Sequence, residues 1–226
     1  MIPGVSSPTH RGKFITFEGL DGSGKSTQLE KLARVLRAHG SSVVVTREPG
    51  GTATGEKVRS LILDTATADL SPLAELALMF ASRAQHIREV VHPAMTHGKI
   101  VLCDRFTDST EAYQGGGRKL GSKPVLALHR ILCGDLQPDL TILMDSDVAA
   151  SVERARRRNE AKSAKGRGHG DENRFEQENR AFFTRVRNAY LAIARREPGR
   201  VVVVNARGTP AQTHAKILEI VKKRVK

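Results

Sequence analysis

Residues 19–26 read Gly-Leu-Asp-Gly-Ser-Gly-Lys-Ser, a complete G-x-x-x-x-G-K-[ST] phosphate-binding loop, and no other stretch constrains the chain as tightly. The β-branched and aromatic run at 14–17 predicts a strand before the loop. After it, a helix ending at Gly40 is predicted, with an apolar face of Leu29, Leu32, Ala33 and Leu36. This is the strand, loop, helix context that the motif needs, and it predicts binding of a nucleoside triphosphate.

The residue types explain how such a loop holds phosphate. Glycines let backbone N–H groups turn toward the anion at the positive end of a helix, and Lys25 adds a point charge. The Ser26 hydroxyl can complete the coordination shell of Mg²⁺. The dinucleotide-binding fingerprint fails, because Thr27 stands where its third glycine is required. The predicted ATP-binding residues are Gly19, Leu20, Asp21, Gly22, Ser23, Gly24, Lys25, Ser26 and Thr27.

Length and composition suit one α/β domain, since 226 residues with 39% apolar and 27% charged residues can bury a single core. The two cysteines, Cys103 and Cys133, show no C-x-x-C spacing, so we expect both to be reduced and buried. That expectation suits the cytoplasm. No leader sequence and no apolar run approaching ~18 residues occurs, so neither secretion nor membrane insertion is expected.

The charge is strongly positive, with 37 Lys+Arg against 24 Asp+Glu and a formal net charge of +13. It calls for a polyanionic partner, either nucleic acid or phosphorylated small molecules. Basic residues concentrate at 154–167 and 216–226, and we interpret the second group as a solvated helix end. Aromatic residues make up only 4% and there is no Trp, which argues against a base-stacking groove and a stable nucleic-acid partner.

Five Val/Ile/Leu-rich runs separated by helical patterns predict a buried parallel sheet flanked by helices. The expected strands cover residues 13–18, 43–46, 100–103, 140–144 and 200–205, after a loose extension at 1–12. A long helix should start at Ser71 and Pro72 and be kinked or ended by Pro93. Its predicted inward face is Leu73, Leu76, Ala77, Phe80, Ala84 and Ile87.

Two further helices and one loop are expected toward the C-terminus. Thr209 and Pro210 repeat the start signal, and a helix over about 175–196 has core positions Phe182, Val186, Ala189 and Ile193. The segment at 159–173 is rich in Lys, Gly, Glu and Ala without apolar periodicity. It is typical of a mobile basic loop, and in a candidate for phosphoryl transfer it suggests a lid.

Three polar segments follow predicted strand ends: TREPGG at 46–51, DRF at 104–106 and STEAYQGGGR at 109–118. In a parallel sheet this edge binds ligands, so these groups should converge on the phosphate loop. Together with FEGLDGSGKST at 17–27, the order of TREPGG, DRFTDST and AYQGGGR resembles the thymidylate kinases from residue 13 onward. The resemblance implies a P-loop NTPase three-layer sandwich, one nucleoside monophosphate kinase domain over 13–226, a basic lid at about 154–173, and a homodimer formed through long helices.

The resemblance also implies an acceptor site for dTMP. Arg47, helped by Arg105, would hold the dTMP phosphate. Phe80 would stack on thymine and Arg83 would donate to its O4, where cytosine presents an amino donor instead. From spacing alone, Phe80 fits core packing and the two arginines Arg83 and Arg105 fit surface ion pairs. The full implied set is Asp21 at the sugar 3′-hydroxyl, Arg47, Phe80, Arg83, Arg105, Ser109 and Thr110 at the N3 edge, and Tyr113 and Gln114 at the sugar.

The implied reaction transfers the ATP γ-phosphoryl group to dTMP, giving dTDP and ADP. The acceptor phosphate needs no strong base because its second pKa is about 6. Lys25, Arg158, Arg105 and Arg47 are the implied catalytic residues, and Ser26 and Asp104 would hold Mg²⁺. Some members carry an arginine in the phosphate loop where this chain has Gly22, so the bacterial form with a lid arginine is implied. Arg158 is the first choice for that arginine, followed by Arg154 or Arg156.

Two other functions stay open from the residues. A deoxynucleoside kinase would phosphorylate a sugar hydroxyl, with Asp104 as the base. A nucleic-acid-dependent ATPase would use the positive charge of the chain.

Overall fold

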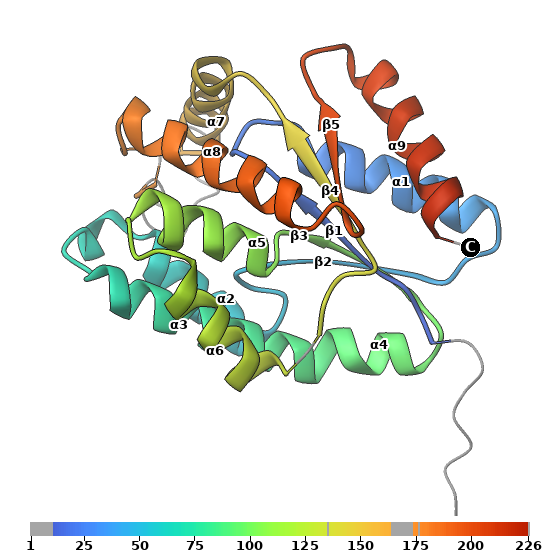
Figure 1. Cartoon of the computed structure of the whole chain (residues 1–226), viewed down its shortest axis with the longest axis horizontal. Coiled ribbons are helices and arrows are strands. Elements are labelled where there is room, and N and C mark those ends of the chain that lie inside the picture. The colour runs from blue at the N-terminus through green and yellow to red at the C-terminus, as the bar shows by residue number, and fades with distance from the viewer. Residues whose placement is uncertain (1–10, 135, 164–173, 176, 226) are drawn as a thin grey trace, which may run out of the picture.

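The computed structural model describes residues 11–134, 136–163, 174–175 and 177–225. Within them lies a five-stranded sheet with the order β2-β3-β1-β4-β5, in which every neighbouring pair is parallel (Figure 1). Its strands are β1 (Phe14–Glu18), β2 (Val43–Arg47), β3 (Ile100–Asp104), β4 (Leu140–Asp145) and β5 (Val201–Asn205). The predicted fold class is confirmed, and each strand begins and ends within one residue of its predicted position.

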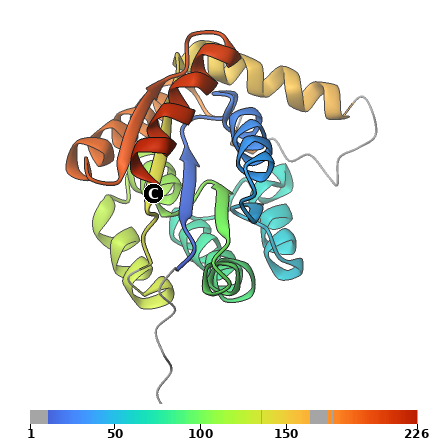
Figure 2. The same ribbon diagram turned by 90° about the vertical axis from the view of Figure 1, so that its right-hand side faces the viewer.

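Helices cover both faces of the sheet. The α-helices are α1 (Lys25–Ala38), α2 (Ala53–Leu63), α3 (Pro72–His86), α4 (His92–Thr96), α5 (Thr107–Thr110), α6 (Ser122–Cys133), α7 (Val148–Ser163), α8 (Arg180–Arg196) and α9 (Pro210–Arg224). Shorter turns are the 3₁₀ helix η1 (Thr65–Thr67) and the π-helical η2 (Ile87–Val91) and η3 (Glu111–Gly117). α1 and α9 lie on one face, and α3, α6 and α8 lie on the other (Figures 1 and 2).

Side chains alternate between the two faces of the sheet along each strand, and this alternation determines on which face each polar residue at a strand end lies. Ile15 and Phe17 of β1 pack in the core beneath α1 and α9, whereas Phe14 packs beneath α3 and α6. Because the period is two, Glu18 shares the α3 face with Phe14. By the same count along β2, Glu48 lies on the α3 face, while Arg47 lies on the α1 face beside its register partner Asp104.

The helix start signals are confirmed, and the predicted inward face of the long helix is confirmed at Leu76, Phe80 and Ile87 but wrong at Leu73 and Ala77. Ser71 accepts a hydrogen bond from the Ala74 N–H, and Thr209 forms a capping box with Gln212. Leu73 is 62% exposed and Ala77 is also exposed, contrary to the prediction for α3. The buried face of α3 is instead Glu75, Leu76, Phe80, Ser82, Arg83 and His86. Hydropathy missed part of this face because three of its six members, Glu75, Arg83 and His86, are charged or ionisable groups that find partners within the fold.

Two helix boundaries also differ from expectation in an instructive way. Pro93 does not end the helical run at once: α3 is followed by the π-helix η2, and the chain stays helical through α4 to Thr96. Helix α8 begins at Arg180 rather than near residue 175, because the Asn179 side chain caps it by accepting from the Phe182 N–H. Phe175 lies outside this helix, with its ring edge-on to Tyr113 at 5.8 Å.

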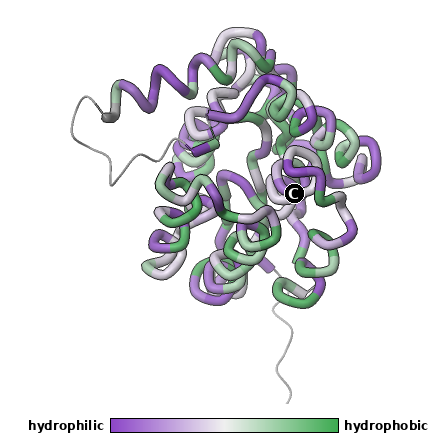
Figure 3. The backbone as a smooth tube through the Cα atoms, turned by 90° about the vertical axis from the view of Figure 1, so that its left-hand side faces the viewer, coloured by the Kyte–Doolittle hydropathy of each residue, from purple (hydrophilic) through white to green (hydrophobic). Residues whose placement is uncertain are grey.

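Helix α7 corrects the expected start of the basic loop. It runs to Ser163, so residues 159–163 are helical, in keeping with the good helix formers Ala, Glu and Lys there. Residues 164–173 of the expected lid lie outside the described residues. α7 projects beyond the sheet, and its hydropathy is largely polar (Figures 2 and 3). No helix of the described chain is long and apolar enough to cross a bilayer.

At the N-terminal end, Arg11 and Gly12 were expected within a loose extension but are bonded to the domain. The Gly12 N–H donates to the Met95 carbonyl at 2.9 Å, and Arg11 pairs with Asp139 at 3.2 Å. Residues 1–10 of that expected extension lie outside the described residues.

Candidate active site

The phosphate loop joins β1 to α1 and leaves the helix N-terminus open. Gly24 stands before α1 with a φ of 94°, and no side chain caps the helix start. Lys25 is only 5% exposed, and its Nζ donates to the carbonyls of Gly19 at 3.1 Å and Leu20 at 2.9 Å. Burial and the nearby charge of Arg105 lower the pKa of Lys25 to about 8. The loop therefore concentrates N–H donors and one cation at a single point.

The predicted metal pair is brought together beside this loop. Ser26 Oγ donates to Asp104 Oδ2 at 2.7 Å, because α1 begins where β3 ends. The other carboxylate oxygen, Asp104 Oδ1, is buried and has no hydrogen-bond partner among the described residues. A hydroxyl and a carboxylate with a spare oxygen form a hard donor set that fits Mg²⁺ bound partly through water.

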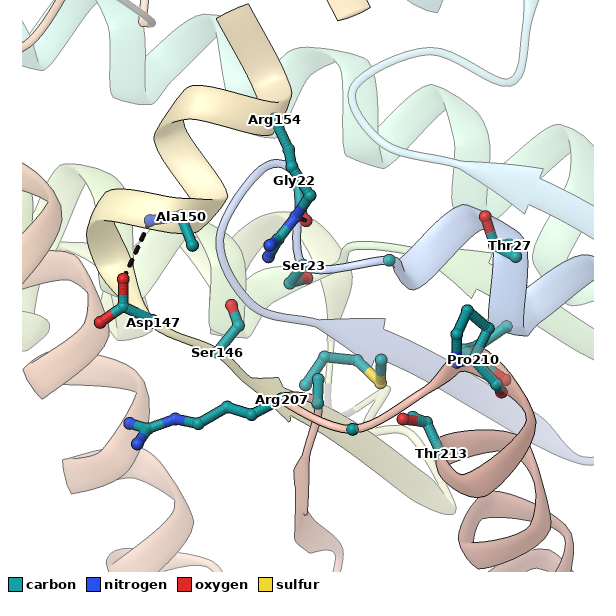
Figure 4. A pocket seen from close by; sticks show the side chains of 15 residues that line it. Gly22, Ser23, Thr27, Ser146, Asp147, Ala150, Arg154, Arg207, Pro210 and Thr213 are labelled. Atoms are coloured by element: carbon teal, nitrogen blue, oxygen red, sulfur yellow. Dashed lines mark hydrogen bonds between the residues drawn. The ribbon is translucent and has the colours of Figure 1, made fainter. Parts of the chain in front are cut away.

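An open pocket of about 450 Å³ lies on the outer side of the loop (Figure 4). The loop forms one wall, and the segments after β4 and β5 form the others, with Ser146, Asp147, Arg207 and Thr213 among their residues. Sequence reasoning did not select these residues, although each follows the carboxyl end of a predicted strand, where ligands bind in such sheets. The pocket places solvent-accessible space directly against the phosphate loop.

Helix α7 lies directly on the phosphate loop at Gly22. A Cβ atom at this glycine, whose φ is 75°, would lie 2.1 Å from the Ser151 carbonyl oxygen. Arg154 Nε donates to the Gly22 carbonyl at 2.7 Å, while its Nη2 donates to Ser151 Oγ at 3.1 Å. Arg158 lies one turn further along the same face and is exposed. The helix thus presents two arginines to a loop that has no room for one of its own.

Asp21, Arg105 and Tyr113, which we predicted at one site, do lie together. Arg105 Nη2 donates to Asp21 Oδ1 at 2.9 Å and to the Tyr113 hydroxyl at 3.2 Å, and its guanidinium lies 4.9 Å from the centre of the Tyr113 ring. Burial alone would raise the pKa of Asp21, but the charges of Arg105 and Lys25 lower it, and Arg158 adds to this effect. Arg105 itself takes a positive φ of 74°.

Beneath this cluster lies Glu18, which sequence reasoning missed. Its Oε1 accepts from the Phe106 N–H at 2.7 Å, and its Oε2 accepts from Ser109 Oγ and from the Tyr190 hydroxyl. Arg105 Nη1 donates to the same Ser109 and Tyr190 oxygens at 2.9 and 3.0 Å. Burial, with the charge of Asp108, raises the pKa of Glu18 to about 8. The signal in the sequence was an acid at the inward position that ends an apolar strand.

Arg83 is buried rather than part of a surface ion pair. It is 2% exposed, with Nε donating to Glu48 Oε2 at 2.7 Å and Nη2 donating to Thr110 Oγ1 at 2.8 Å. Its guanidinium carbon lies 4.8 Å from the ring centre of Phe80 and 5.2 Å from that of Phe106. Phe80 is fully buried in the core, as its spacing indicated. The remaining nitrogen, Arg83 Nη1, is buried without a partner among the described residues.

Two residues predicted at the dTMP site lie apart from the Arg83 and Arg105 clusters, and one of them, Arg47, lines a pocket with Ser26 and Asp104. Arg47 is 55% exposed, pairs with Glu56 at 2.8 Å, and stands on the α1 face rather than beside Arg105. Gln114 is fully buried and donates from Nε2 to Glu75 Oε1 at 2.7 Å. Glu75 also pairs with Arg118 and Arg174, so this glutamine belongs to a buried charge cluster below η3.

The geometry as a whole joins an open phosphate loop to a buried network of arginines. Thr110 contacts Arg83, the preceding Ser109 contacts Arg105, and Arg105 reaches Asp21 inside the loop. Groups that bind one phosphorylated ligand therefore adjoin groups suited to a second. A parallel sheet with this loop and this pair of arginines defines a P-loop phosphotransferase.

Comparison with known proteins narrows the class. Residues 17–217 match the family model described as thymidylate kinase. The chain is 50% identical over 197 residues to "Thymidylate kinase" of Pelobacter propionicus, covering 87% of this chain and 88% of that protein. It is also 50% identical over 204 residues to the Pseudomonas syringae pv. syringae "Thymidylate kinase", covering 90% and 92% of the two chains. The crystal structure of thymidylate kinase from Ehrlichia chaffeensis superimposes with a TM-score of 0.72 at 32% identity, over 93% of this chain and 99% of that one. The chain belongs to the thymidylate kinase family, whose members phosphorylate dTMP with ATP to give dTDP.

Proposed function

We propose that this enzyme transfers the ATP γ-phosphoryl group in line to the phosphate of dTMP, with the residues below in the roles given. The observation that carries the proposal is the continuous run of contacts from Arg83 through Thr110, Ser109 and Arg105 to Asp21. It links a buried cation with a spare donor to the phosphate loop itself. One end suits a base and the other a phosphate, as a nucleoside monophosphate requires.

On the donor side, the loop N–H groups and Lys25 bind the ATP phosphates, and the pocket in Figure 4 receives the rest of the nucleotide. Ser26 and Asp104 hold Mg²⁺, which neutralises phosphate charge when bound. Arg154 and Arg158 approach from α7, and we assign Arg158 to the transferred group because Arg154 is already engaged by the Gly22 carbonyl. The positive charge of Arg158 helps to lower the pKa of Asp21 in the phosphate loop, which supports this assignment.

On the acceptor side, Arg105 contacts the dTMP phosphate, and Asp21 and Tyr113 contact the sugar. Arg83 Nη1 donates to the base O4, while Ser109 and Thr110 line the base edge. Arg47 would have to leave Glu56 and Gln114 would have to leave Glu75 to reach dTMP, and their roles stay predictions. No general base is needed, since the acceptor phosphate is already largely ionised at neutral pH.

We further propose that the enzyme is a cytoplasmic homodimer. Both cysteines are free and buried, which suits a reducing compartment. Large apolar side chains are exposed on α2, α3 and α6, and a second copy would cover them. They are Leu61, Leu73, Leu126, Ile131 and Leu132. Light scattering on the purified protein tests the dimer, and the mass of a single chain would refute it.

An ADP-release assay tests the activity across dTMP, dUMP, dCMP, dAMP, dGMP and thymidine. We expect dTMP to be the best acceptor and dUMP to be a poorer one, because a methyl group contributes only ~1–3 kcal/mol of discrimination. Phosphorylation of thymidine in preference to dTMP would instead identify a deoxynucleoside kinase. ATP hydrolysis stimulated by DNA or RNA would support the ATPase alternative.

A further inference from the structure

The TREPGG segment contributes a buried glutamate, Glu48, in addition to its arginine. Glu48 is 3% exposed, and both carboxylate oxygens are used: Oε2 accepts from Arg83 Nε and Oε1 accepts from His86 Nδ1 at 2.8 Å. A carboxylate can only accept, so Nδ1 of His86 carries the proton. His86 is fully buried, and its Nε2 lies 2.6 Å from Thr46 Oγ1. Thr46, His86, Glu48 and Arg83 therefore form one buried chain of hydrogen bonds.

The backbone of the segment is shaped around this chain. The Glu48 N–H donates to the Asp104 carbonyl at 2.9 Å, which fixes its backbone at the end of β3. At Gly51, with a φ of 78°, an added Cβ would lie 2.7 Å from both Thr46 Oγ1 and His86 Cδ2. Only glycine leaves room for that hydrogen bond. Thr46, Glu48 and Gly51 of the motif thus serve one arrangement.

That arrangement leaves the Arg83 guanidinium no freedom. The rings of Phe80 and Phe106 lie against it. Within its own plane, Glu48 and Thr110 hold two of its three nitrogens, so the direction of the third, Nη1, is fixed. Burial would raise the pKa of Glu48, but Arg83 and His86 lower it, so the carboxylate stays charged beside the cation.

We propose that Glu48, held by His86 and Thr46, is a positioning residue for base selection: it fixes Arg83 so that the unpaired Nη1, which carries only N–H donors, faces the base. This inference rests on the proposed function. A donor held in one direction can hydrogen-bond to the O4 of a 4-oxo pyrimidine. It disfavours a 4-amino pyrimidine, because the amino group would bring a second donor to the same point. A glutamate that only stabilised the fold would affect all acceptors equally.

The test compares kcat/KM for dTMP and dCMP. In Glu48→Gln, the loss of the anion frees Arg83 to turn, and we expect the dTMP-to-dCMP ratio to fall about tenfold or more. Glu219→Gln removes a glutamate that pairs with Lys223 on exposed α9, and we expect it to leave the ratio unchanged. An unchanged ratio in Glu48→Gln, with both acceptors impaired equally, would overturn the proposal.

Two further variants keep the test decisive if Glu48→Gln folds poorly. His86→Asn places an amide N–H where Nδ1 lies and should preserve the ratio, whereas His86→Leu offers no donor and should lower it severalfold. Equal ratios in the two His86 variants would also contradict the proposal. If the wild-type enzyme prefers dTMP while these variants leave its ratio intact, only this inference fails. If the wild type does not use dTMP, the proposed function itself fails.

Discussion

The proposed acceptor and donor sides of this site differ in the burial of their arginines. On the acceptor side, Arg83 and Arg105 are 2% and 13% exposed and are bonded to protein carboxylates. On the donor side, Arg154 and Arg207 are exposed residues that line an open pocket, and Arg158 is exposed on α7. Breaking a buried pair costs about 3–5 kcal/mol, whereas exposed pairs contribute about 0–1 kcal/mol. In the proposed site, the folded protein therefore fixes the acceptor-side arginines, whereas the donor-side arginines are exposed, and Arg154 among them is bonded to the Gly22 carbonyl.

The largest effect should come from the exposed side, because we propose that Arg158 there acts on the transferred group. We expect Arg158→Ala to lower kcat about 10³-fold or more while the affinity for dTMP stays near normal. Arg157→Ala is the matched control on the same helix, since Arg157 is 75% exposed and pairs with Glu153. Single-turnover kinetics and dTMP titration measure the two quantities. Normal turnover in Arg158→Ala would shift the role to Arg154 or Arg156.

The proposed Mg²⁺ residues, Ser26 and Asp104, lie between the two sides, and we expect an intermediate effect there. Asp104→Asn keeps the size of the side chain but removes the charge beside Ser26. We expect the Mg²⁺ concentration for half-maximal rate to rise by about 10- to 100-fold, with little change in KM for dTMP. A magnesium titration at saturating ATP measures this. A changed KM for dTMP at unchanged magnesium demand would instead place Asp104 at the acceptor.

The buried side makes a prediction about pH. The pKa of Glu18 is raised from an ordinary value of 4.5 to about 8, so the folded protein keeps a proton that the unfolded chain has lost. The contribution of Glu18 to the free energy of unfolding is therefore full below pH ~4.5 and is lost as the pH rises through about 8. Glu18→Gln should flatten that decline. Urea unfolding at pH 5 and pH 8 checks it, and an equal decline in both proteins would contradict the raised pKa.

The smallest effect should come from one hydroxyl on the boundary. Tyr113→Phe keeps the ring beneath Arg105 but removes the contacts with Asp21 and Arg105. In the proposed site this hydroxyl contacts the uncharged sugar, and because a neutral hydrogen bond contributes about 0.5–1.5 kcal/mol, we expect KM for dTMP to rise only severalfold. Steady-state kinetics measure it. A loss as large as that of Arg158→Ala would show that the hydroxyl takes part in the transfer itself.

The sequence predicted the architecture and the loop chemistry because both leave local signals. Apolar runs marked the strands, and the polar strand ends were expected to converge on the phosphate loop, as Asp104 does at Ser26 and Arg105 does at Asp21. The sequence also contained the information that Arg47 and Glu48 lie on opposite faces of the sheet, since neighbouring strand residues point to opposite faces. Extending the period of two through residue 48 would have assigned Arg47 to the α1 face.

What the sequence did not predict are the buried polar groups. Glu18, Glu48, His86 and Tyr190 are satisfied by partners far away in the chain, and hydropathy gives no sign of such pairs. The same reason explains the face of α3, where Arg83 and His86 are buried while Leu73 is exposed. The expected loop began too early for a different reason: α7 has apolar residues on one face only up to Ala155, and its polar second half has no apolar stripe that would reveal a helix.

The fit of α7 over Gly22 has a consequence for how this family can change. Relocating an arginine from the helix to the loop is not open to a single substitution, because even one added carbon would collide with the helix backbone at Ser151. Helix α7 would first have to shift away from the loop. The intermediate protein would then have neither the arginine on the helix in place nor the arginine in the loop. Sequences of the two kinds should accordingly differ at paired positions, loop and helix together, with few intermediates between them.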